Sequence, residues 1–433
     1  MRRSVQVITL GCSKNTVDTE HLLHDVSDRL DVIGEGEGDV PYVDYLLINT
    51  CGFIGDAKQE SIDAILSAVE RKKAGRVGEL IVFGCLSQRY SSEMPGLIPE
   101  VDNWFGARDT APLVRALGCV PGDGTGRFRT GGPPGTAYLK ISEGCDRRCS
   151  YCAIPAIRGA HRSVPVEDLV REAQALSADG VRELVLIAQD TTYYGLDLYG
   201  RRALAELLER LSGVDGIEWL RIHYSYPTDF PEDVLEQMAS NPKVCPYLDI
   251  PLQHISDPVL KNMRRQISGA QTRELVKRMR ARVPGVVLRT TMIVGHPGEG
   301  EAEFAELLDF VREARFERLG AFTYSEEEGT WGARHLEDTV PQHIKGSRLD
   351  RLMELQQEIS LEFNRSRVGS VEKVLVDGFG DGLLVCRSRY ESPEVDGEIL
   401  VRTDAADPQA LAGTFIDVRI TGADFYDLTA EMI

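Results

Sequence analysis

The first 120 residues alternate short runs of aliphatic and β-branched residues with longer stretches of helical periodicity. The apolar runs and helical stretches follow one another in the order 5–10, 16–30, 44–49, 55–73 and 79–83. Strands that are apolar on both faces are typical of parallel sheets covered by helices. We therefore expect residues 1–120 to form a parallel α/β domain.

A Gly- and Pro-rich stretch follows, and it predicts a linker at 121–135. The alternation then resumes, with apolar runs at 138–141, 183–187, 218–222, 247–250, 286–293 and 319–324. Helical patterns lie between them at 166–178, 203–211, 231–239, 271–282 and 301–314, and a long one follows at 342–364. About six such units predict a partial or full parallel (β/α) barrel over residues 136–366.

The last segment, residues 367–433, changes character. It has short β-type runs separated by Gly and Asp, such as VEKVLVDG, DGLLVCRS, GEILVRT and GTFIDVRITG. Runs of this length with turn residues between them predict a small antiparallel β-barrel.

Composition narrows the class of protein. The 433 residues include 49 Lys and Arg against 68 Asp and Glu, a net charge of −19. No apolar run approaches the roughly 18 residues of a membrane span, and the N-terminal residues lack a signal-peptide stretch. We therefore expect a cytoplasmic protein without a membrane segment. Nine cysteines, an odd number, favour metal or redox chemistry over a disulfide framework.

Three of these cysteines lie in one short loop, at Cys145, Cys149 and Cys152. This spacing allows one loop to wrap a metal centre, and three thiolates on a cubane cluster leave its fourth iron open. The alternative is a zinc site. Zinc normally requires a fourth Cys or His at recognisable spacing, and the neighbouring sequence has no second CxxC pair.

A second group of cysteines is dispersed along the chain. Cys12, Cys51 and Cys85 each follow one of the first three predicted strands. The carboxyl ends of parallel strands share one edge of a sheet, where ligands bind, so these thiols should converge. The alternative is that they are scattered core residues, because free Cys is often buried. Cys119, Cys245 and Cys386 have no matching partners and receive no role.

The loop Glu143–Cys152, with Tyr151 before the third cysteine, resembles the signature of the radical S-adenosylmethionine (SAM) enzymes. With the N-terminal cysteines and the final barrel, the chain resembles the methylthiotransferases over nearly its whole length. That resemblance implies an N-terminal domain with an auxiliary 4Fe–4S cluster, a partial (β/α)6 barrel with a second 4Fe–4S cluster that binds SAM, and a small β-barrel called TRAM.

Within this family, several motifs are similar to the RimO-type branch. They are 10–15 (LGCSKN), 84–90 (GCLSQRY), 152–159 (CAIPAIRG), 189–195 (QDTTYYG) and 247–254 (YLDIPLQH). Two positions depart from the usual pattern: Val164, where Arg is common, and His296, where Phe is commoner. Neither is an expected cluster ligand, so the expected chemistry is unaffected.

The resemblance also implies a reaction and its residues. The branch methylthiolates the β-carbon of an aspartate in the twelfth protein of the small ribosomal subunit. By the same resemblance, Cys145, Cys149 and Cys152 hold the radical SAM cluster, and the auxiliary cluster is held by Cys12, Cys51 and Cys85. Tyr151 is expected in the adenine pocket, and Gln189 and Gly295 are weaker candidates for cofactor contacts. An electron donor such as flavodoxin or ferredoxin is an expected partner.

Charge bears on the choice of substrate, because the sister MiaB-type branch modifies an adenosine of tRNA. The TRAM-like segment has 13 acidic and 6 basic residues, so phosphate neutralisation there is disfavoured and tRNA is an unexpected partner. An acidic surface is complementary to a basic ribosomal protein, although it could also serve solubility alone. An iron–sulfur electron carrier or cluster scaffold is the alternative from another functional class.

Overall fold

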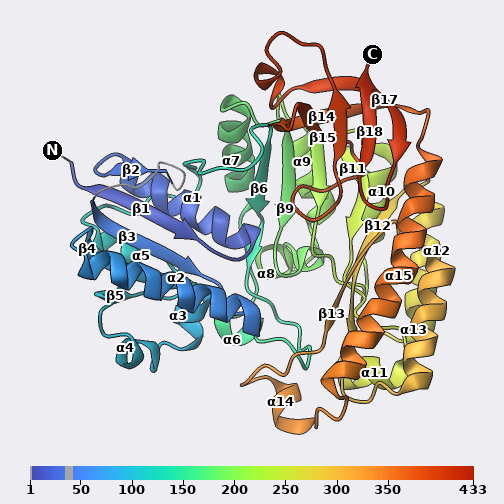
Figure 1. Cartoon of the computed structure of the whole chain (residues 1–433), viewed down its shortest axis with the longest axis horizontal. Coiled ribbons are helices and arrows are strands. Elements are labelled where there is room, and N and C mark those ends of the chain that lie inside the picture. The colour runs from blue at the N-terminus through green and yellow to red at the C-terminus, as the bar shows by residue number, and fades with distance from the viewer. Residues whose placement is uncertain (1, 35–41) are drawn as a thin grey trace. The chain divides into compact units, whose positions relative to one another are not determined.

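The computed structural model describes residues 2–34 and 42–433. The chain divides into two compact units, which are described in turn. The first consists of Met1–Gly131, Ser142–Arg147 and Cys152–Ala175, and the second of Gly132–Ile141, Arg148–Tyr151 and Leu176–Ile433. The domain boundaries expected at residues 120, 135 and 366 stay predictions. Figure 1 traces the chain from its blue N-terminal elements to its red C-terminal strands.

The first unit contains a five-stranded sheet in which every neighbouring pair is parallel. Its strands, in spatial order, are β2 (Asp31–Ile33), β1 (Ser4–Thr9), β3 (Val43–Thr50), β4 (Val77–Gly84) and β5 (Asn103–Trp104). The three predicted strands are confirmed as β1, β3 and β4. The edge strands β2 and β5 have three and two residues and are too short to give a period-2 pattern.

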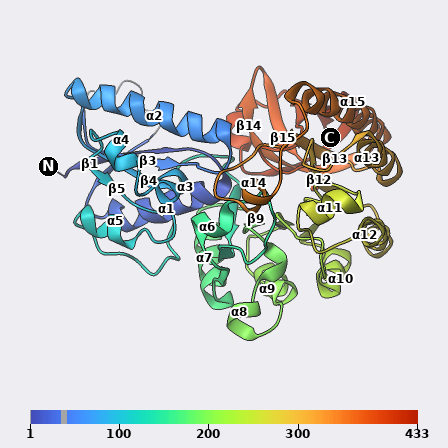
Figure 2. The same ribbon diagram turned by 90° about the horizontal axis from the view of Figure 1, so that it is seen from below.

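Helices cover both faces of this sheet. Side chains of α1 (Ser13–Ser27) and α5 (Ala111–Ala116) pack with Tyr45 and Leu47 of β3. On the opposite face, α2 (Gly55–Lys73) packs on Leu46 and Ile48 of the same strand. Figure 2 shows α1 and α2 on opposite sides of the sheet. This two-sided burial explains why the middle of β3, from Tyr45 to Ile48, is a continuous apolar run.

The remaining elements of the first unit are short. They are α3 (Cys85–Arg89), α4 (Met94–Leu97), β7 (Ser142–Glu143), α6 (Ile154–Arg158) and β8 (Arg162–Ser163), and α7 (Val166–Ala178) begins here. β7 pairs with β8 in an antiparallel ribbon. Between residues 118 and 135 there is neither helix nor strand, as the Gly and Pro content predicts.

The second unit contains an open six-stranded sheet whose strand order follows the chain. The strands are β6 (Thr136–Lys140), β9 (Glu183–Ile187), β10 (Trp219–Ile222), β11 (Val244–Asp249), β12 (Val287–Val294) and β13 (Arg318–Thr323). All neighbours are parallel. An open parallel sheet with helical crossovers is a partial (β/α)6 barrel, which confirms the fold expected from the pattern.

Helices connect its successive strands, and the last two α-helices follow its last strand. The longer ones are α9 (Leu204–Ser212), α10 (Glu232–Ser240), α12 (Gly269–Arg282), α13 (Glu301–Ala314) and α15 (Gln342–Ser366). Shorter ones are α8 (Leu196–Tyr199), α11 (Asp257–Asn262) and α14 (Trp331–His335). Among the described residues, no helix is both long enough and apolar enough to cross a lipid bilayer.

Five strands close the C-terminal barrel in the order β14, β15, β16, β18, β17. They are β14 (Val371–Gly380), β15 (Leu383–Arg387), β16 (Ile399–Arg402), β17 (Phe415–Ala423) and β18 (Leu428–Met432). Four pairings are antiparallel, as expected, and β16 runs parallel to β18. A closed barrel with five strands cannot alternate direction all the way round, so at least one neighbouring pair must be parallel.

Buried charges and aromatic rings join the barrel to the central sheet within the second unit. The Glu183 carboxylate accepts hydrogen bonds from Arg221 (2.7 Å) and Arg387 (2.9 Å), and all three side chains are buried. These guanidinium groups overcome the effect of burial and lower the pKa of Glu183 to about 2. Trp219 and Phe415 pack edge to face, with ring centroids 4.7 Å apart.

Candidate functional site

The structure places Cys12, Cys51 and Cys85 at the carboxyl edge of the parallel sheet in the first unit. Cys12 precedes α1, Cys51 directly follows β3, and Cys85 begins α3 directly after β4. The order β1-β3-β4 makes these strands direct neighbours, so the three thiols lie at adjacent positions along one edge. Cys119, Cys245 and Cys386 are not part of this edge and lie in hydrophobic clusters, and Cys85 also packs in a small cluster with Ala107, Ala153 and Ile157.

Two glycines allow the cysteine loops to approach one another. Gly11 has φ +92°, and a Cβ built there would lie 2.7 Å from Cys51 Cβ and 3.1 Å from its Sγ. A Cβ on Gly52 would lie 2.7 Å from the backbone N of Leu86, the residue after Cys85. A side chain at either glycine would collide with the neighbouring cysteine loop. Glycine at these two positions therefore lets the loops that carry the three cysteines pack closely against one another.

The three thiols differ in exposure, and burial raises the pKa of Cys51 and Cys85. Cys12 is exposed, Cys51 is half-buried and Cys85 is only 6% exposed. Burial raises the pKa of Cys85 to about 11, the Arg158 guanidinium opposes this, and negative charge on Cys12 and Cys51 raises the pKa further. Three neighbouring thiols resist joint ionisation unless a cation compensates them, and iron in a cluster supplies that positive charge.

The donor geometry distinguishes a cluster from a single ion. No three His, Cys, Asp or Glu side chains in the described part of the chain are close enough to hold one metal ion. Thiolates on different corners of a four-iron cluster stand further apart than the ligands of one zinc ion. Each of the two cysteine groups supplies three thiols, which is the donor set of a four-iron cluster with one open iron.

A buried arginine contacts this edge from α6. Arg158 is 3% exposed, and its Nε donates to Cys85 Sγ at 3.2 Å. Its Nη atoms donate to Asn15 Oδ1 (2.6 Å), Asp18 Oδ2 (2.7 Å) and Glu143 Oε2 (3.0 Å). Arg158 thus places a fixed positive charge beside the most buried of the three thiols. It lies six residues after Cys152, in one of the motifs that carry the resemblance, but sequence reasoning gave it no role.

The second cysteine group lies in the loop after β7. In the first unit, the Cys145 N–H donates to the Gly159 carbonyl (3.0 Å), and Cys145 Sγ accepts a hydrogen bond from the Arg147 N–H (3.4 Å). In the second unit, Cys149 Sγ lies 3.8 Å from the Tyr226 hydroxyl. Because these cysteines fall within eight consecutive residues, the loop itself limits their separation.

Arg265, which sequence reasoning missed, is the main cationic neighbour of Cys149. Its Nη1 lies 3.7 Å from Cys149 Sγ, and its Nη2 donates to the Pro251 carbonyl at 2.6 Å. The guanidinium also stacks over the Tyr226 ring, 4.1 Å from its centroid. It adjoins no predicted motif, so no local signal in the sequence marks it.

The weaker candidates lie around the carboxyl ends of the central strands. Gln189 follows the end of β9, and Gly295 follows β12 with φ +74°. The Gly295 N–H donates to Glu299 Oε2 at 2.9 Å. The Tyr151 ring stands edge-on to the His296 ring, with centroids 6.3 Å apart. Their expected contacts with a cofactor stay predictions.

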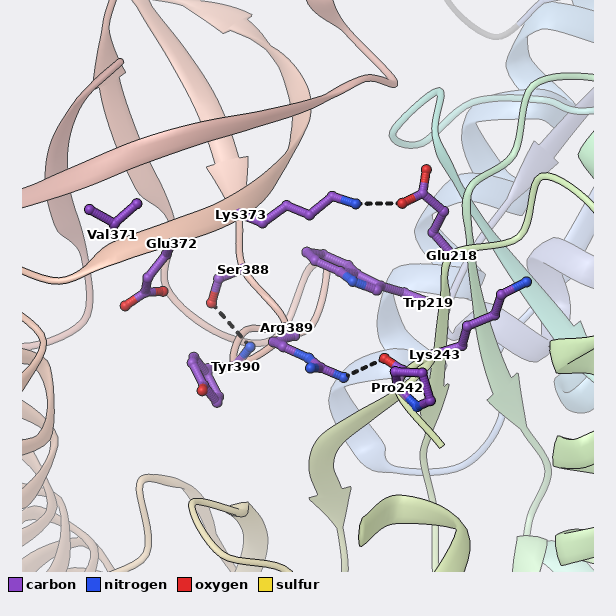
Figure 3. A pocket seen from close by; sticks show the side chains of 10 residues that line it. All are labelled: Glu218, Trp219, Pro242, Lys243, Val371, Glu372, Lys373, Ser388, Arg389 and Tyr390. Carbon is purple, nitrogen blue, oxygen red and sulfur yellow. Dashed lines mark hydrogen bonds and ion pairs between the residues drawn. The ribbon is translucent and has the colours of Figure 1, made fainter. Parts of the chain in front are cut away.

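A separate pocket of about 430 Å³ lies where the central sheet meets the C-terminal barrel (Figure 3). Its lining includes Trp219, Tyr390 and an ion pair between Lys373 and Glu218. It contains none of the predicted site residues, so we assign it a packing role between the sheet and the barrel.

Three protein families match successive parts of the chain. Residues 4–106 match "Uncharacterized protein family UPF0004", residues 139–311 match "Radical SAM superfamily", and residues 368–433 match "TRAM domain". Each of the two cysteine groups thus falls in a different matched region. The matches follow the same order as the three folded parts expected from the sequence.

Curated relatives cover the whole chain. The ribosomal protein uS12 methylthiotransferase RimO of Porphyromonas gingivalis is 50% identical over 443 residues, covering 100% of both chains. RimO of Christiangramia forsetii is 49% identical, covering 99% of this chain and 94% of that one. RimO of Bacteroides fragilis is 47% identical over 434 residues, covering 100% of both.

Solved structures share the fold at low sequence identity. The radical S-adenosylmethionine methyltransferase TsrM from Kitasatospora setae, with cobalamin and a [4Fe-4S] cluster bound, is 13% identical with a TM-score of 0.57. The match covers 95% of this chain and 85% of TsrM. The cobalamin-dependent enzyme OxsB, with S-adenosylmethionine bound, gives a TM-score of 0.51 at 14% identity, covering 83% of this chain and 56% of OxsB. At these identities the likeness concerns the fold alone.

Proposed function

Because the chain belongs to the RimO family of ribosomal protein uS12 methylthiotransferases, we propose that it attaches a methylthio group to ribosomal protein uS12. The chain is a radical SAM enzyme with a C-terminal TRAM domain, and its cofactors are 4Fe–4S clusters and SAM. The acceptor in this proposal is the β-carbon of an aspartate. The hydrogen on that carbon is only very weakly acidic, and the radical chemistry that SAM and a 4Fe–4S cluster supply can remove it as a hydrogen atom.

In this proposal, each of the two cysteine groups holds one 4Fe–4S cluster. Cys145, Cys149 and Cys152 hold the cluster that binds SAM, and Cys12, Cys51 and Cys85 hold the auxiliary cluster. When bound, the first cluster would supply the electron that cleaves SAM, and the auxiliary cluster would supply the site for the sulfur that is transferred. Arg158 orients Cys85 through the hydrogen bond to its Sγ, and Arg265 does the same for Cys149. The neighbouring Tyr151, Gln189 and Gly295 are proposed to line the SAM site.

One observation carries the proposal: three cysteines from separate strands meet at one sheet edge, while three others share a loop. An electron carrier with a single cluster needs only one of these groups. Two groups with three thiolates each leave an open iron in each cluster, as a reaction with two separate ligands requires.

Iron content tests the two-cluster assignment. Anaerobically reconstituted protein is expected to bind about eight irons, and the combined change Cys145→Ala, Cys149→Ala and Cys152→Ala to leave about four. The matched control, Cys119→Ala, Cys245→Ala and Cys386→Ala, should keep all the iron. Full iron content in the first variant would contradict the assignment.

Substrate choice is tested by incubating the reduced enzyme and SAM with either isolated uS12 or tRNA. Mass spectrometry is expected to find a methylthio adduct on an aspartate of uS12. An adduct on tRNA alone would instead indicate the MiaB-type reaction. Failure to release 5′-deoxyadenosine on reduction would favour the iron–sulfur carrier or scaffold.

The partners follow from the same reaction. The proposed setting is the cytoplasm, where uS12 is made, and the electron for SAM cleavage comes from a protein donor of the flavodoxin or ferredoxin type. tRNA is an unfavourable partner, because residues 367–433 carry 13 acidic against 6 basic residues and cannot neutralise many phosphates.

A further inference from the structure

A basic groove of about 720 Å³ lies in the second unit beside the loop that carries Cys149. Four cationic residues line it: Arg148, Lys261, Arg264 and Arg265. Its one acidic lining residue, Asp257, has a carboxylate oxygen that accepts the Gly269 N–H at 2.7 Å. The groove is therefore a positive patch on a chain whose net charge is −19.

The outer cations of the groove are available to a partner. Arg148 and Lys261 are exposed, and neither forms an ion pair with any carboxylate in the described ranges. Arg264 has φ +56°, and its guanidinium lies over the Trp331 ring, 4.9 Å from the centroid. An aromatic ring holds a cation in place without neutralising its charge. These three cations, against the single carboxylate of Asp257, give the groove a net positive charge.

Arg265 forms the inner end of the groove. It is 8% exposed, its Nη1 lies 3.7 Å from Cys149 Sγ, and its Nε has no hydrogen-bond partner among the described residues. One buried guanidinium thus touches both the groove and the sulfur of a proposed cluster ligand. A molecule seated in the groove is separated from Cys149 by a single side chain.

We propose that the basic groove is the docking surface for an acidic one-electron donor protein. The inference rests on the proposed function, which places a cluster on Cys149 and requires an electron from outside. In the transfer, the donor is oxidised by one electron and the cluster is reduced by one. No bond forms or breaks, and no proton moves.

The charges favour this occupant over the other macromolecules of the reaction. A ribosomal protein is generally basic, so three outward cations repel it. RNA binding needs an extended positive surface, whereas these cations form a small patch on a strongly acidic chain. Electron-transfer complexes are small and transient, and complementary charge steers them together. The groove has the charge and size for that kind of contact.

The test compares the reconstituted full chain with its double variant Arg148→Glu, Lys261→Glu. Cluster reduction by reduced flavodoxin, an acidic donor, is followed by the loss of visible absorbance at low and high salt. We expect the second-order rate at low salt to fall about 10- to 100-fold in the variant, and its decline with added salt to disappear. The matched control Arg210→Glu, Arg402→Glu reverses two exposed charges elsewhere in the same unit and should leave the rate unchanged.

Photoreduced deazaflavin, a small neutral reductant, separates docking from damage to the cluster. It should reduce wild type and double variant equally. An unchanged flavodoxin rate in the double variant, or slowing with both reductants, would overturn the proposal. Binding of flavodoxin to the iron-free chain, measured by fluorescence titration, should weaken in the double variant whether or not the proposed reaction holds. A short RNA is added as a competitor to the flavodoxin titration. If it weakens flavodoxin binding more than salt of the same ionic strength does, the groove binds RNA and the proposal is overturned.

Discussion

At the scale of single residues, Arg158 makes the most contacts in the cysteine edge of the first unit. Its guanidinium joins Asn15 and Asp18 of α1, Cys85 of α3 and Glu143 of β7, which are three separate segments of the chain. The carboxylates of Asp18 and Glu143 compensate its buried charge, so Arg158 remains ionised beside the sulfur. A fixed cation at this position favours the thiolate form that a cluster needs.

Replacing Arg158 by Leu should lower the iron content from about eight toward about four per chain. It should also lower the free energy of unfolding by about 3–5 kcal/mol, because Asp18 and Glu143 lose their buried partner. Arg158→Lys keeps the charge with fewer donors and should retain part of the iron. Iron analysis and urea unfolding measure the two effects.

Arg108→Leu is the matched control for Arg158. Arg108 donates to the Ile157 carbonyl at 2.8 Å, so it anchors the same helix, α6, without contacting a cysteine. If Arg108→Leu lost as much iron as Arg158→Leu, Arg158 would serve only to hold α6.

His296 gives a prediction about pH. Burial lowers its pKa to about 4 from the usual 6.5, so between these values the unfolded chain binds a proton that the folded chain does not. Stability should therefore fall as pH drops from 6.5 to 4, by up to about 3 kcal/mol. In the variant His296→Phe, the free energy of unfolding should depend less on pH over this range. Urea unfolding of the iron-free wild type and variant at pH 7 and pH 5 measures this dependence. An equal change in the free energy of unfolding for wild type and variant would contradict the prediction.

At the scale of elements, the pattern of the sequence predicted the long strands and helices to within a few residues. The helices at 55–73 and 301–314 have the predicted limits, and all six central strands form where their apolar runs lie. The short strands β2, β5, β7, β8 and β18 were missed. They have two to five residues each, so their own residues are too few to show a pattern, even where the partner is the preceding strand, as β17 is for β18.

The cysteines of the candidate site were predictable, because chain order and strand direction determine where loops after parallel strands meet. Their cationic neighbours were not. Arg158 contacts Cys85 across 73 residues, and Arg265 contacts Cys149 across 116. Contacts at such separations depend on tertiary packing, which hydrophobic periodicity does not encode.

Gly84, at the end of β4, tests how the loop orients Cys85. It has φ +102°, and a Cβ there would lie 2.7 Å from the backbone N and O of Thr50. Gly84→Ala should destabilise the protein by more than about 1 kcal/mol and reduce iron binding, because the backbone must move. Iron content and thermal unfolding provide the readouts.

Gly346 is the control for that substitution. It lies within α15, and no atom comes within 4 Å of its built Cβ. Gly346→Ala should stabilise the protein by about 0.5–1 kcal/mol with no change in iron, because alanine is the better helix former. Equal iron loss in both variants would rule out a specific role for Gly84.

At the scale of the whole molecule, the central sheet and the C-terminal barrel of the second unit depend on a buried charge cluster. Glu183→Gln removes the anion between Arg221 and Arg387 and should cost about 3–5 kcal/mol, since two buried cations lose compensation. Urea unfolding measures the loss, and limited proteolysis should release the barrel at lower urea. Glu218→Gln breaks the exposed ion pair with Lys373 (Figure 3) and should cost no more than about 1 kcal/mol. Equal losses would contradict the role of the buried cluster.

The discontinuous make-up of the first unit has a consequence for biosynthesis. The sheet that presents Cys12, Cys51 and Cys85 is encoded within the first 104 residues, but the unit also includes residues 152–175 and, with them, Arg158. A nascent chain translated only as far as the linker lacks the arginine that contacts Cys85. The cysteine edge of the first unit is therefore completed only after the loop with the second cysteine group has been translated. The hydrogen bond from Arg158 to Cys85 cannot form until both groups of cysteines are present in the nascent chain.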